Sequence, residues 1–425
     1  MKIHKYLYLA GVWLRNRKIF DCYRSLKESE KYDLKTLQEM QLARLQDLLV
    51  HAYGRSRFYK NKFDSCGFHP SHIRSLQDVE KIPCSTKEEV LANCAAIQIM
   101  DCGERLFYSE TSGSTGRPLV FYRNQEWDAW HNASVFRGYS WHQVEPWERS
   151  GYLWGYNIAP AKRLKMRLLD SLQNRFRLFS YKDEDVEEFS RKLRHARFLE
   201  GYSSMVYEVA KKVNANARHG YNLQMVKGTS EKILEVYQRE AQRAFGRRLV
   251  SEYGSAEGGI IAFECPGRNM HINMETSLVE VIEEEIVVTN LVSRSFPIIR
   301  YKLGDYVRVD RETKCSCGMA HQIITEVTGR VGALIHGKKH TYPSLTLYYV
   351  FKNLAGRNLV YNYQVVQDTK GKVVAYLEKK LEPAETSLIQ GEFRKYFSDD
   401  LEVVIQDDCQ RSDFSGKRKD FISTV

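Results

Sequence analysis

The stretch Tyr108-Ser-Glu-Thr-Ser-Gly-Ser-Thr-Gly-Arg-Pro118 separates two short runs of strand-forming residues, 105–108 and 119–122. Glycines let a backbone approach a ligand closely and expose its amide N–H groups, and serine and threonine hydroxyls add further donors. A strand, a loop of such residues and a second strand predict a cradle for a phosphate chain. A Ser/Gly surface turn is the alternative, and the loop alone leaves both open.

The loop is not a Walker A motif, because no Gly-Lys-Ser/Thr follows at the required spacing and no helix begins there. The residues that would face a phosphate are small or hydroxylic, and a fixed cation follows them. They are Thr111, Ser112, Gly113, Ser114, Thr115, Gly116 and Arg117.

The chain has 425 residues, which exceeds the usual size of a single hydrophobic core, so we expect at least two domains. Its formal net charge is +11, from 64 Lys and Arg against 53 Asp and Glu. This charge favours an anionic partner without identifying it. Because the two signs are interleaved and no nucleic-acid-binding module is recognisable, we do not expect nucleic acid as a partner.

Nine cysteines, an odd number scattered along the chain, indicate a reducing compartment rather than a disulfide scaffold. Residues 1–14 contain a short apolar run that leads into Arg15-Asn-Arg-Lys18 without a small-residue cleavage site. No run reaches the roughly 18 apolar residues of a membrane span. We therefore expect a cytoplasmic protein without a transmembrane segment. Its first helix packs against the core, stays exposed or makes weak contact with a membrane surface.

Helical and strand patterns alternate through the first 255 residues, which predicts an α/β sheet with helices on its faces. The expected helices are 33–64, one that begins near 85–89, 124–150, 186–196, 205–217 and 233–245. The expected strands in this part are 151–156, 198–202 and 248–253.

From residue 259 the pattern changes to strands, and after residue 333 it becomes mixed again. The expected strands are 259–263, 277–281, 285–290, 298–301, 306–309, 361–367, 372–378 and 402–406, with helices near 344–354 and 383–397. Because the residues after 333 can form a small core of their own, we predict one domain over 1–330 and a second over 331–425.

Two acidic stretches follow predicted strands. In Glu252-Tyr-Gly-Ser-Ala-Glu257 a strand ends at a glycine turn, which leaves an aromatic ring and a carboxylate at the sheet edge where α/β proteins bind ligands. In Arg300-Tyr-Lys-Leu-Gly-Asp305 a carboxylate follows glycine at a strand end, which suits two ribose hydroxyls. An ordinary surface turn with a solvated carboxylate is the alternative for both.

Two basic stretches lie near the predicted second domain. Thr328-Gly-Arg330 stands at the domain junction, where its arginine is either a surface residue or part of a hinge. Ser415-Gly-Lys417-Arg-Lys419 is a basic loop that, taken alone, is typical of a solvated tail.

Three cysteines and one histidine form a candidate metal site. Cys265 and His271 lie in one predicted loop and Cys315 and Cys317 in another. This is a closed tetrahedral ligand set for structural zinc, and neighbouring β-loops would bring the two pairs together. The intervals differ from those of common zinc fingers, so unrelated reduced cysteines are the alternative, and His321 is an alternative fourth ligand.

In this order the stretches resemble the motifs of the adenylate-forming ligase superfamily. Within it they are most similar to the phenylacetate–CoA ligase family, in the CapK-like branch associated with capsular polysaccharide biosynthesis. The matching motifs are the phosphate loop 111–118, the nucleotide motif Thr229-Ser-Glu231, the aromatic-glycine-acid motif 253–257, the ribose motif 300–305, the hinge Gly329-Arg330 and the C-terminal Gly416-Lys417. The stretches 45–53, 58–59, 82–83 and 201–204 also fit, so the resemblance covers nearly the whole chain.

The resemblance implies a large N-terminal adenylate-forming domain with mixed sheets, flanking helices and a small β-rich subdomain. It also implies a small α+β C-terminal lid that rotates between two poses. ATP and Mg²⁺ are the implied cofactors, a small-molecule carboxylate is the implied substrate, and coenzyme A is one candidate acyl acceptor. The oligomeric state is not indicated.

Roles follow residue by residue from the motif matches. Ser112, Ser114 and Thr115 would hold the pyrophosphate end of ATP, with Thr111, Gly113 and Gly116 in the same loop. Tyr253 would pack on the adenine beside Gly254, Ser230 and Glu231, and Asp305 would bind the ribose hydroxyls. Glu257 would hold magnesium, Arg330 would reach the ribose or phosphate region, and Lys417 would bridge the carboxylate and the α-phosphate. Cys265, His271, Cys315 and Cys317 match metal-ligand positions in some relatives, which favours structural zinc.

The chain departs from the family pattern at three positions. Gly332 stands where the hinge usually has aspartate, Leu119 stands where a lysine often follows the phosphate loop, and Lys232 replaces the proline after the nucleotide glutamate. Rotation about a glycine remains feasible, but a role that needs a carboxylate at the hinge is lost.

The expected reaction is ATP-dependent activation of a carboxylate to acyl-AMP with release of pyrophosphate. Transfer of the acyl group to coenzyme A or to another thiol, amine or hydroxyl would follow. Trp154, Tyr156 and Tyr202 are candidates for the acid pocket, although aromatic residues more often serve a core. The alternative is a non-catalytic protein of the same fold that acts as a partner or scaffold in a polysaccharide assembly complex.

Overall fold

The computed structural model describes residues 2–101, 103–111, 118–153, 160–179, 183–216, 220–311, 314–330, 334–409 and 420–425. By its contacts the chain divides into two units. The first consists of Met1–Glu148, Ser251–Leu303 and Val307–Glu326, and the second of Arg149–Val250, Gly304–Tyr306 and Val327–Val425.

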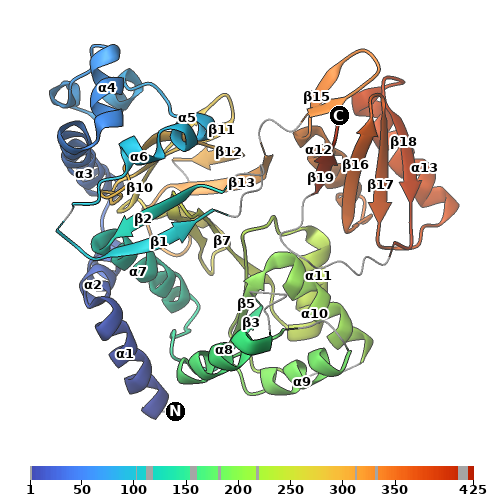
Figure 1. Ribbon diagram of the computed structural model, residues 1–425. Helices are drawn as coiled ribbons and strands as arrows, with labels where there is room; N and C mark the ends of the chain where they lie inside the picture. The colour runs from blue at the N-terminus through green and yellow to red at the C-terminus, as the bar shows by residue number, and fades with distance from the viewer. Residues whose placement is uncertain are drawn as a thin grey trace. The chain divides into compact units, whose positions relative to one another are not determined.

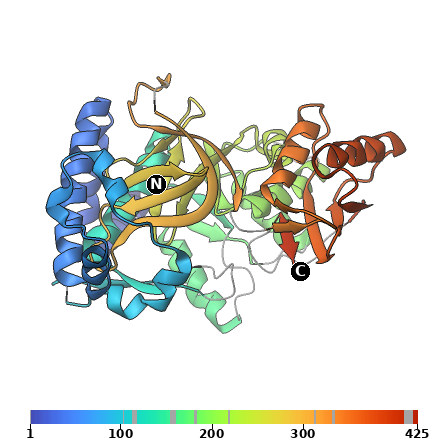
Figure 2. The same ribbon diagram turned by 90° about the horizontal axis from the view of Figure 1, so that it is seen from above.

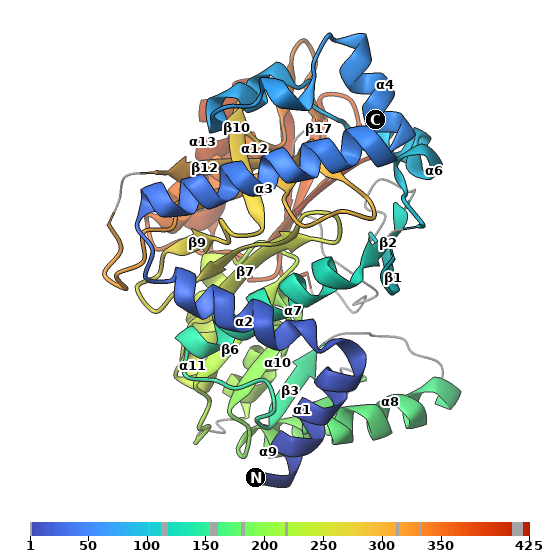
Figure 3. The ribbon, with the colours of Figure 1, turned by 90° about the vertical axis from the view of Figure 1, so that its left-hand side faces the viewer.

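The first unit begins with a series of helices (Figures 1 and 3). They are α1 Lys2–Asn16, α2 Lys18–Ser29, α3 Leu34–Arg55, α4 Arg57–Ser65, the short η1 Pro70–His72 and η2 Leu76–Lys81, α5 Lys87–Ala92 and α6 Cys94–Ile97. The predicted helix 33–64 is two helices, because Ser56 is extended (φ −104°, ψ 116°) and its side chain caps α4 by accepting from Tyr59 N.

A two-stranded hairpin precedes the helix that packs on α2. β1 Leu106–Glu110 and β2 Val120–Asn124 pair antiparallel, which confirms the two strands predicted around the phosphate-loop stretch. α7 spans Gln125–Trp141, so the helix predicted over 124–150 ends early. Gln143 adopts a left-handed φ of 56°, and Pro146 has no N–H to continue a helix.

The strands of the first unit follow the order β10-β11-β12-β13-β9-β8-β7. Their bounds are β7 Leu249–Ser255, β8 Gly259–Glu264, β9 Met270–Ile272, β10 Ser277–Ile282, β11 Glu285–Asn290, β12 Ile298–Asp310 and β13 Ile323–Arg330. The two strands predicted at 298–301 and 306–309 are one strand, β12. Arg300 (φ 44°) and Gly304 (φ 81°) disturb its backbone without ending it.

The second unit contains a parallel sheet in the order β6-β5-β3-β4. The strands are β3 Ser150–Leu153, β4 Arg175–Arg177, β5 Phe198–Tyr202 and β6 Met225–Thr229, and the helices are α8 Pro160–Leu172, α9 Asp183–Leu193, α10 Ser203–Ala215 and α11 Glu235–Phe245. The alternation of strands and helices predicted an α/β arrangement, which is confirmed. α8, β4 and β6 were not predicted.

The C-terminal part of the second unit is α+β. A 4-stranded sheet has the order β18-β17-β16-β19, and β14 and β15 form a hairpin. The elements are β14 Leu334–His336, β15 Thr341–Pro343, α12 Leu345–Ala355, β16 Tyr363–Thr369, β17 Lys372–Leu377, α13 Pro383–Phe397, β18 Glu402–Gln406 and β19 Phe421–Ser423. Figure 2 shows α12 and α13 beside this sheet, where Phe351 stacks on Tyr363 with ring centroids 3.5 Å apart.

One hydrophobic core runs through the second unit. It contains buried residues from the parallel-sheet part, such as Leu199 and Tyr207, together with residues from the C-terminal part, such as Leu354 and Phe393. The division into domains 1–330 and 331–425 stays a prediction. In the described part of the chain no helix is both long and apolar enough to cross a bilayer, and the cytoplasmic location also stays a prediction.

Candidate functional site

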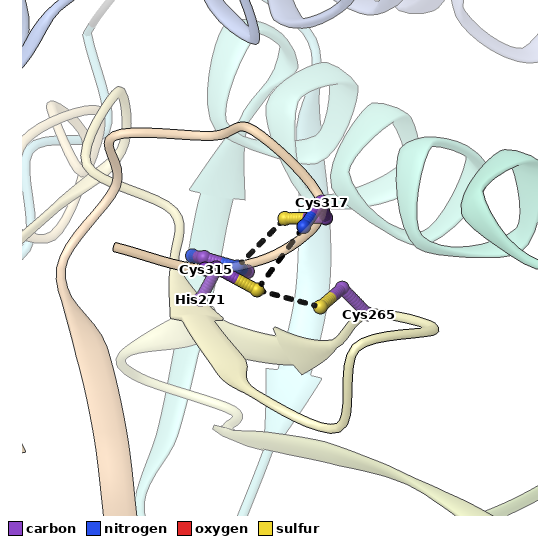
Figure 4. Close-up of side chains that lie close together, drawn as sticks. All are labelled: Cys265, His271, Cys315 and Cys317. Atoms are coloured by element: carbon purple, nitrogen blue, oxygen red, sulfur yellow. Dashed lines mark hydrogen bonds between the residues drawn. The ribbon is translucent and has the colours of Figure 1, made fainter. Parts of the chain in front are cut away.

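The four predicted metal ligands lie on two loops of the first unit that a β-ladder holds together. Cys265 directly follows β8, and His271 lies in β9, which pairs antiparallel with β8. Cys315 and Cys317 lie in the loop before β13, whose first residue Ile323 pairs with His271. Because β13 lies beside β9, the two loops meet although they are 50 residues apart in sequence (Figure 4).

The side chains of this Cys/His cluster point toward one another. One ligand atom from each residue can be chosen so that all four lie within 4.8 Å of one another. Cys265 Sγ is 3.6 Å from Cys315 Sγ, and Cys317 Sγ is 3.2 Å from His271 Nε2 (Figure 4). A disulfide needs about 2.05 Å between its sulfur atoms. Two thiolates at about 2.3 Å from one tetrahedral zinc ion would be about 3.8 Å apart, which the observed spacing fits.

The chain around the cluster leaves room for the sulfur atoms and donates two hydrogen bonds to Cys315 Sγ. At Gly267 an added Cβ would lie only 3.1 Å from Cys315 Sγ, so any larger residue would crowd the cluster. Asn269 Nδ2 (3.2 Å) and the backbone N of Cys317 (3.5 Å) donate to Cys315 Sγ. Burial alone would raise the pKa of Cys315. The hydrogen bonds lower this pKa by more than burial raises it, so the pKa lies below its ordinary value and the thiolate is favoured.

The tautomer of His271 is fixed by the chain. Its Nδ1 is 3.0 Å from the backbone oxygen of His321, and because a carbonyl only accepts, Nδ1 carries the proton. Nε2 then presents its lone pair to the cluster. Burial lowers the pKa of His271 to about 4, so the ring is neutral at neutral pH. A neutral imidazole whose other nitrogen donates to a carbonyl is the arrangement found at protein zinc sites.

His321, the alternative fourth ligand, uses its side chain elsewhere. Its Nε2 is 2.8 Å from Glu275 Oε1, and Glu275 also accepts from Arg137 Nη1 (2.5 Å), Arg137 Nη2 (3.0 Å) and the hydroxyl of Ser29. The side chains of Arg137 and Glu275 are each 1% exposed. Burial alone would raise the pKa of Glu275, but Arg137 and His321 hold it well below its ordinary value. Sequence reasoning missed this buried ion-pair network, because its members are joined only in space.

The aromatic-glycine-acid motif lies at the end of β7. Tyr253 and Gly254 are inside the strand and Glu257 is in the turn to β8, so the prediction that the strand ends at Gly254 was wrong. The register shifts between Tyr253 and Gly254. A Cβ on Gly254 would lie 2.3 Å from the backbone oxygen of Gly259, so the close approach of β8 requires glycine here.

Glu257, the predicted magnesium ligand, is a buried acid. Its residue is 7% exposed, and its backbone oxygen accepts from Asn290 Nδ2 at 3.1 Å. Its carboxylate has no hydrogen-bond or ion-pair partner among the residues that the structure describes. Its carboxylate oxygens are not among the buried atoms that lack a partner, so they are accessible to a ligand. The position therefore fits a site that a cation completes.

Thr111 closes the base of the predicted phosphate loop. Leu119 N donates to Thr111 Oγ1 at 2.8 Å, and Thr111 N donates to Leu119 O at 3.0 Å. The strands on both sides continue this ladder, with Glu110 opposite Val120. The remaining predicted loop residues lie outside the described ranges: Ser112, Gly113, Ser114, Thr115, Gly116 and Arg117.

The nucleotide motif forms a strained turn after β6. Ser230 has a φ of 65°, which is uncommon for a residue with a side chain. Glu231 Oε2 accepts from Ser204 N at 2.8 Å, at the start of α10. Lys232, which departs from the family pattern, donates from Nζ to the backbone oxygen of Thr328 in β13 at 3.0 Å.

The ribose motif lies inside β12 and not at a strand end, so that part of the prediction was wrong. Asp305 follows Gly304, whose φ of 81° displaces the strand locally. Arg300 of the same motif serves the structure of the first unit. Its guanidinium donates to Glu280 (3.0 and 2.8 Å) and to the backbone oxygens of Glu80 (3.1 Å) and Ile82.

The other predicted residues divide into two groups. Arg330 is the last residue of β13, and Tyr202 is the last residue of β5, where burial raises the pKa of its hydroxyl. Lys417, the hinge residue Gly332, Trp154 and Tyr156 lie outside the described ranges.

No family model matches the chain. Among curated proteins, it is 22% identical over 354 residues to Protein CapK of Staphylococcus aureus, with 80% of this chain and 78% of that protein covered. It is 25% identical over 299 residues to the phenylacetate-coenzyme A ligase of Escherichia coli strain K12, with 64% and 67% covered. It is 22% identical over 387 residues to the phenylacetate-coenzyme A ligase of Thermus thermophilus, with 84% of both covered.

The fold is that of a known ligase. The crystal structure of 2-hydroxyisobutyryl-CoA ligase in the postadenylation state, in complex with 2-HIB-AMP, matches with a TM-score of 0.74 and 15% identity. The match covers 93% of this chain and 91% of that one. The thioesterification state of the same ligase matches with a TM-score of 0.62. These likenesses confirm the predicted adenylate-forming ligase fold.

The motifs, the curated relatives and the fold agree. The chain is therefore similar to CapK and to the phenylacetate-coenzyme A ligases, and it has the fold of an adenylate-forming ligase.

Proposed function

We propose that this chain activates a small-molecule carboxylate with ATP and then transfers the acyl group to coenzyme A or to another thiol, amine or hydroxyl. One observation carries the proposal: six motif stretches follow one another in the family order, along a chain that aligns with a phenylacetate-coenzyme A ligase over 84% of its length. A surface turn explains any one of these stretches, but it does not explain their order.

In the first half-reaction a carboxylate oxygen of the acid bonds to the α-phosphorus of ATP, and the bond from that phosphorus to pyrophosphate breaks. Because two anions must meet, cationic groups have to neutralise the developing charge. Lys417 would supply one such charge at the carboxylate and the α-phosphate. Mg²⁺ would supply more charge, and the unpartnered carboxylate of Glu257 supports that residue as its ligand.

The remaining motif residues would position the nucleotide. The 112–117 loop, closed at its base by Thr111, would hold the pyrophosphate end and so keep the leaving group apart from the adenylate. Asp305 would accept from the ribose hydroxyls, Arg330 would contact the ribose or phosphate region, and Tyr253 would pack on the adenine. Ser230 and Glu231 would contact the nucleotide, and Glu231 is also bonded to the first turn of α10.

ATP–pyrophosphate exchange tests the first half-reaction. The assay is run at saturating magnesium over aryl, fatty and amino acids, and we expect exchange that depends on one class of acid. The Lys417→Ala variant should lose exchange while calorimetry still detects ATP binding. If the wild-type chain supports no exchange with any acid, the enzymatic proposal is wrong. A chain that also fails to bind ATP would favour the non-catalytic scaffold.

We also propose that Cys265, His271, Cys315 and Cys317 hold a structural zinc ion. The four side chains offer three thiols and a neutral imidazole. Together they would fill all four positions of a tetrahedral ion and leave none open to substrate. Elemental analysis of the purified protein should find one zinc per chain, and Cys315→Ser should remove it. Cys409→Ser, which changes a cysteine outside the cluster, is the matched control and should retain the metal.

A role in capsule or cell-surface polysaccharide biosynthesis rests on the likeness to CapK. Candidate acceptors can be compared by adding coenzyme A, amino sugars or hydroxylated sugars to an enzyme that has formed its adenylate. A role in polysaccharide assembly predicts that a sugar acceptor consumes the adenylate faster than coenzyme A does. Consumption by coenzyme A alone would count against it.

A further inference from the structure

The first helix, α1, presents a continuous apolar face to solvent. Ile3 and Leu14 are each 73% exposed, Tyr6 is 67%, Trp13 is 57% and Leu7 is 48% exposed. At about 100° per residue these five positions fall within an arc of about 120° on the helix surface. Single exposed apolar residues are ordinary, but five on one side of one helix mark an interaction surface.

The opposite side of α1 is fixed to the rest of the first unit. Arg15 Nη2 is 2.8 Å from Asp128 Oδ1, and Asn16 Nδ2 donates to the backbone oxygen of Gln125 at 2.7 Å. Tyr8 packs on Phe136 of α7, with ring centroids 6.2 Å apart. Figure 3 shows α1 leading into α2, which lies alongside α7. The contacts orient α1, so its apolar face is held outward by the fold.

The charge around this face is positive, which favours an anionic partner. The charged side chains of residues 2–18 are all basic, namely Lys2, Lys5, Arg15, Arg17 and Lys18; Arg15 and Lys18 pair with Asp128 and Glu104, and the others add positive charge beside the face. Two copies of the chain that met through α1 would bring these like charges together, whereas an anionic surface would complement them. Tyr6 and Trp13 are amphipathic aromatic residues, which are favoured where one end of a side chain is apolar and the other is wet.

We propose that α1 is an interfacial helix that binds the surface of an anionic lipid bilayer. A helix of 15 residues is about 22 Å long and would lie in the plane of the interface, with Trp13, Leu14 and Ile3 among the acyl chains and headgroups. The exposed cations Lys5 and Arg17 would meet the phosphates of anionic lipids. This surface contains none of the nucleotide-motif residues and does not depend on which acid the enzyme activates.

Vesicle co-sedimentation of the full chain tests the proposal. We expect binding to vesicles of phosphatidylcholine mixed with phosphatidylglycerol, at least about tenfold weaker binding to phosphatidylcholine alone, and weaker binding as salt is raised. The double variant Trp13→Ala, Leu14→Ala removes two large exposed side chains and should weaken binding to the mixed vesicles at least about tenfold.

A matched double variant controls for the loss of exposed apolar surface in general. Leu334→Ala with Leu388→Ala also removes two side chains, each 43% exposed and outside α1, and should bind vesicles as the wild type does. Both double variants should retain the melting temperature and the exchange activity of the wild type. These two measurements show that the chain is folded.

Three results would overturn the proposal. The first is a wild-type chain that does not bind the anionic vesicles, and the second is a Trp13→Ala, Leu14→Ala variant that binds them as tightly as the wild type. The third is a wild-type dimer in sedimentation velocity that this variant abolishes, because the face would then be a contact between copies of the chain. Failure of the exchange assay with every acid would leave the vesicle result interpretable, since it concerns a different surface.

Discussion

The Cys/His cluster and the buried ion-pair network lie side by side in the first unit, but their buried polar groups differ in whether the chain itself supplies their partners. In the network the guanidinium of Arg137 faces the carboxylate of Glu275, and the charges compensate each other. In the cluster four donor atoms converge and no cationic side chain completes them among the described residues. The two meet at His321, whose side chain serves the network and whose carbonyl orients His271.

This difference separates groups that the chain satisfies itself from groups that need a ligand from outside. The same distinction applies to the nucleotide motifs. Arg300 is fully bonded to its own unit, whereas the carboxylate of Glu257 has no partner among the described residues and its oxygens are accessible to a ligand. Changes at self-satisfied groups should therefore lower stability, and changes at groups that need a ligand should lower the binding of that ligand. Removal of the proposed metal should lower stability as well as empty its binding site.

The largest effect is expected when the proposed zinc ion is removed from the cluster. Chelation or Cys315→Ser should lower the free energy of unfolding by several kcal/mol. This is less than the about 10–16 kcal/mol of isolated zinc fingers, because β8, β9 and β13 also hold the two loops. Thermal melting with and without chelator measures it, with Cys409→Ser as control. An unchanged melting temperature after metal removal would show that the cluster, like the network, needs no ligand from outside the chain for its stability.

Breaking the ion-pair network should cost nearly as much. Glu275→Gln leaves Arg137 buried without its counter-charge and should lower the free energy of unfolding by about 3–5 kcal/mol. Glu188→Gln breaks an exposed pair with Lys192 and should cost at most about 0.5 kcal/mol. Denaturant titration compares the two, and equal small losses would show that the network is not a buried charge pair in solution.

The network also predicts the response of stability to acid. The pKa of Glu275 in the folded chain lies well below the ordinary 4.5, so its contribution is present above pH 4.5 and is lost as the pH falls through the folded pKa. The wild-type chain should therefore lose more stability below pH 4.5 than the Glu275→Gln variant loses. Parallel acid titrations of the two chains would contradict this.

Lys417, the proposed catalytic lysine, should affect rate without affecting stability. Lys417→Ala should lower ATP–pyrophosphate exchange by about 10²–10³-fold, as expected for loss of one group that stabilises transition-state charge. Its unfolding free energy should match that of Lys419→Ala, the control two residues away. A loss of exchange that appears equally in the Lys419→Ala variant would remove the specific role of Lys417.

The smallest effect is expected at the base of the phosphate loop. Thr111→Ala removes the hydrogen bond from Leu119 N and should lower the free energy of unfolding by about 0.5–1.5 kcal/mol. Because the loop would be less well ordered, the KM for ATP should rise more than kcat falls. Thr111→Ser keeps the hydroxyl and should restore both values, and a failure of this rescue would assign the effect to the methyl group.

Elements with strong local signals could be predicted from the sequence. The β1–β2 pair, β5, α10, α11, β16–β18 and α13 follow their hydrophobic periods closely. The errors arose where the backbone changes locally but the hydrophobic periodicity does not show it. Ser56 divides one predicted helix into two, and Arg300 and Gly304 disturb a strand that continues through them. β9 has three residues, too few to show alternation, yet it is the strand that carries His271.

The parts of the candidate site that depend on residue type and sequence order could be predicted, and the parts that depend on contacts in space could not. The types of the four cluster residues suggested zinc before their positions were known, and the choice of His271 over His321 needed the carbonyl and the carboxylate that each ring contacts. The Arg137–Glu275 network leaves no trace in the sequence, because its partners are 138 residues apart. Motif order suggested the reaction, but it does not identify the acid.

The central claim is that a carboxylate oxygen of the acid attacks the α-phosphorus of ATP, and an oxygen label tests it most directly. An acid that supports exchange is labelled with ¹⁸O in its carboxylate and incubated with the enzyme, ATP and hydroxylamine as a general acceptor. When the acyl group moves to the amine, the bridging oxygen stays with the nucleotide. We predict one ¹⁸O atom in the AMP; label in inorganic phosphate, or unlabelled AMP, would contradict the claim.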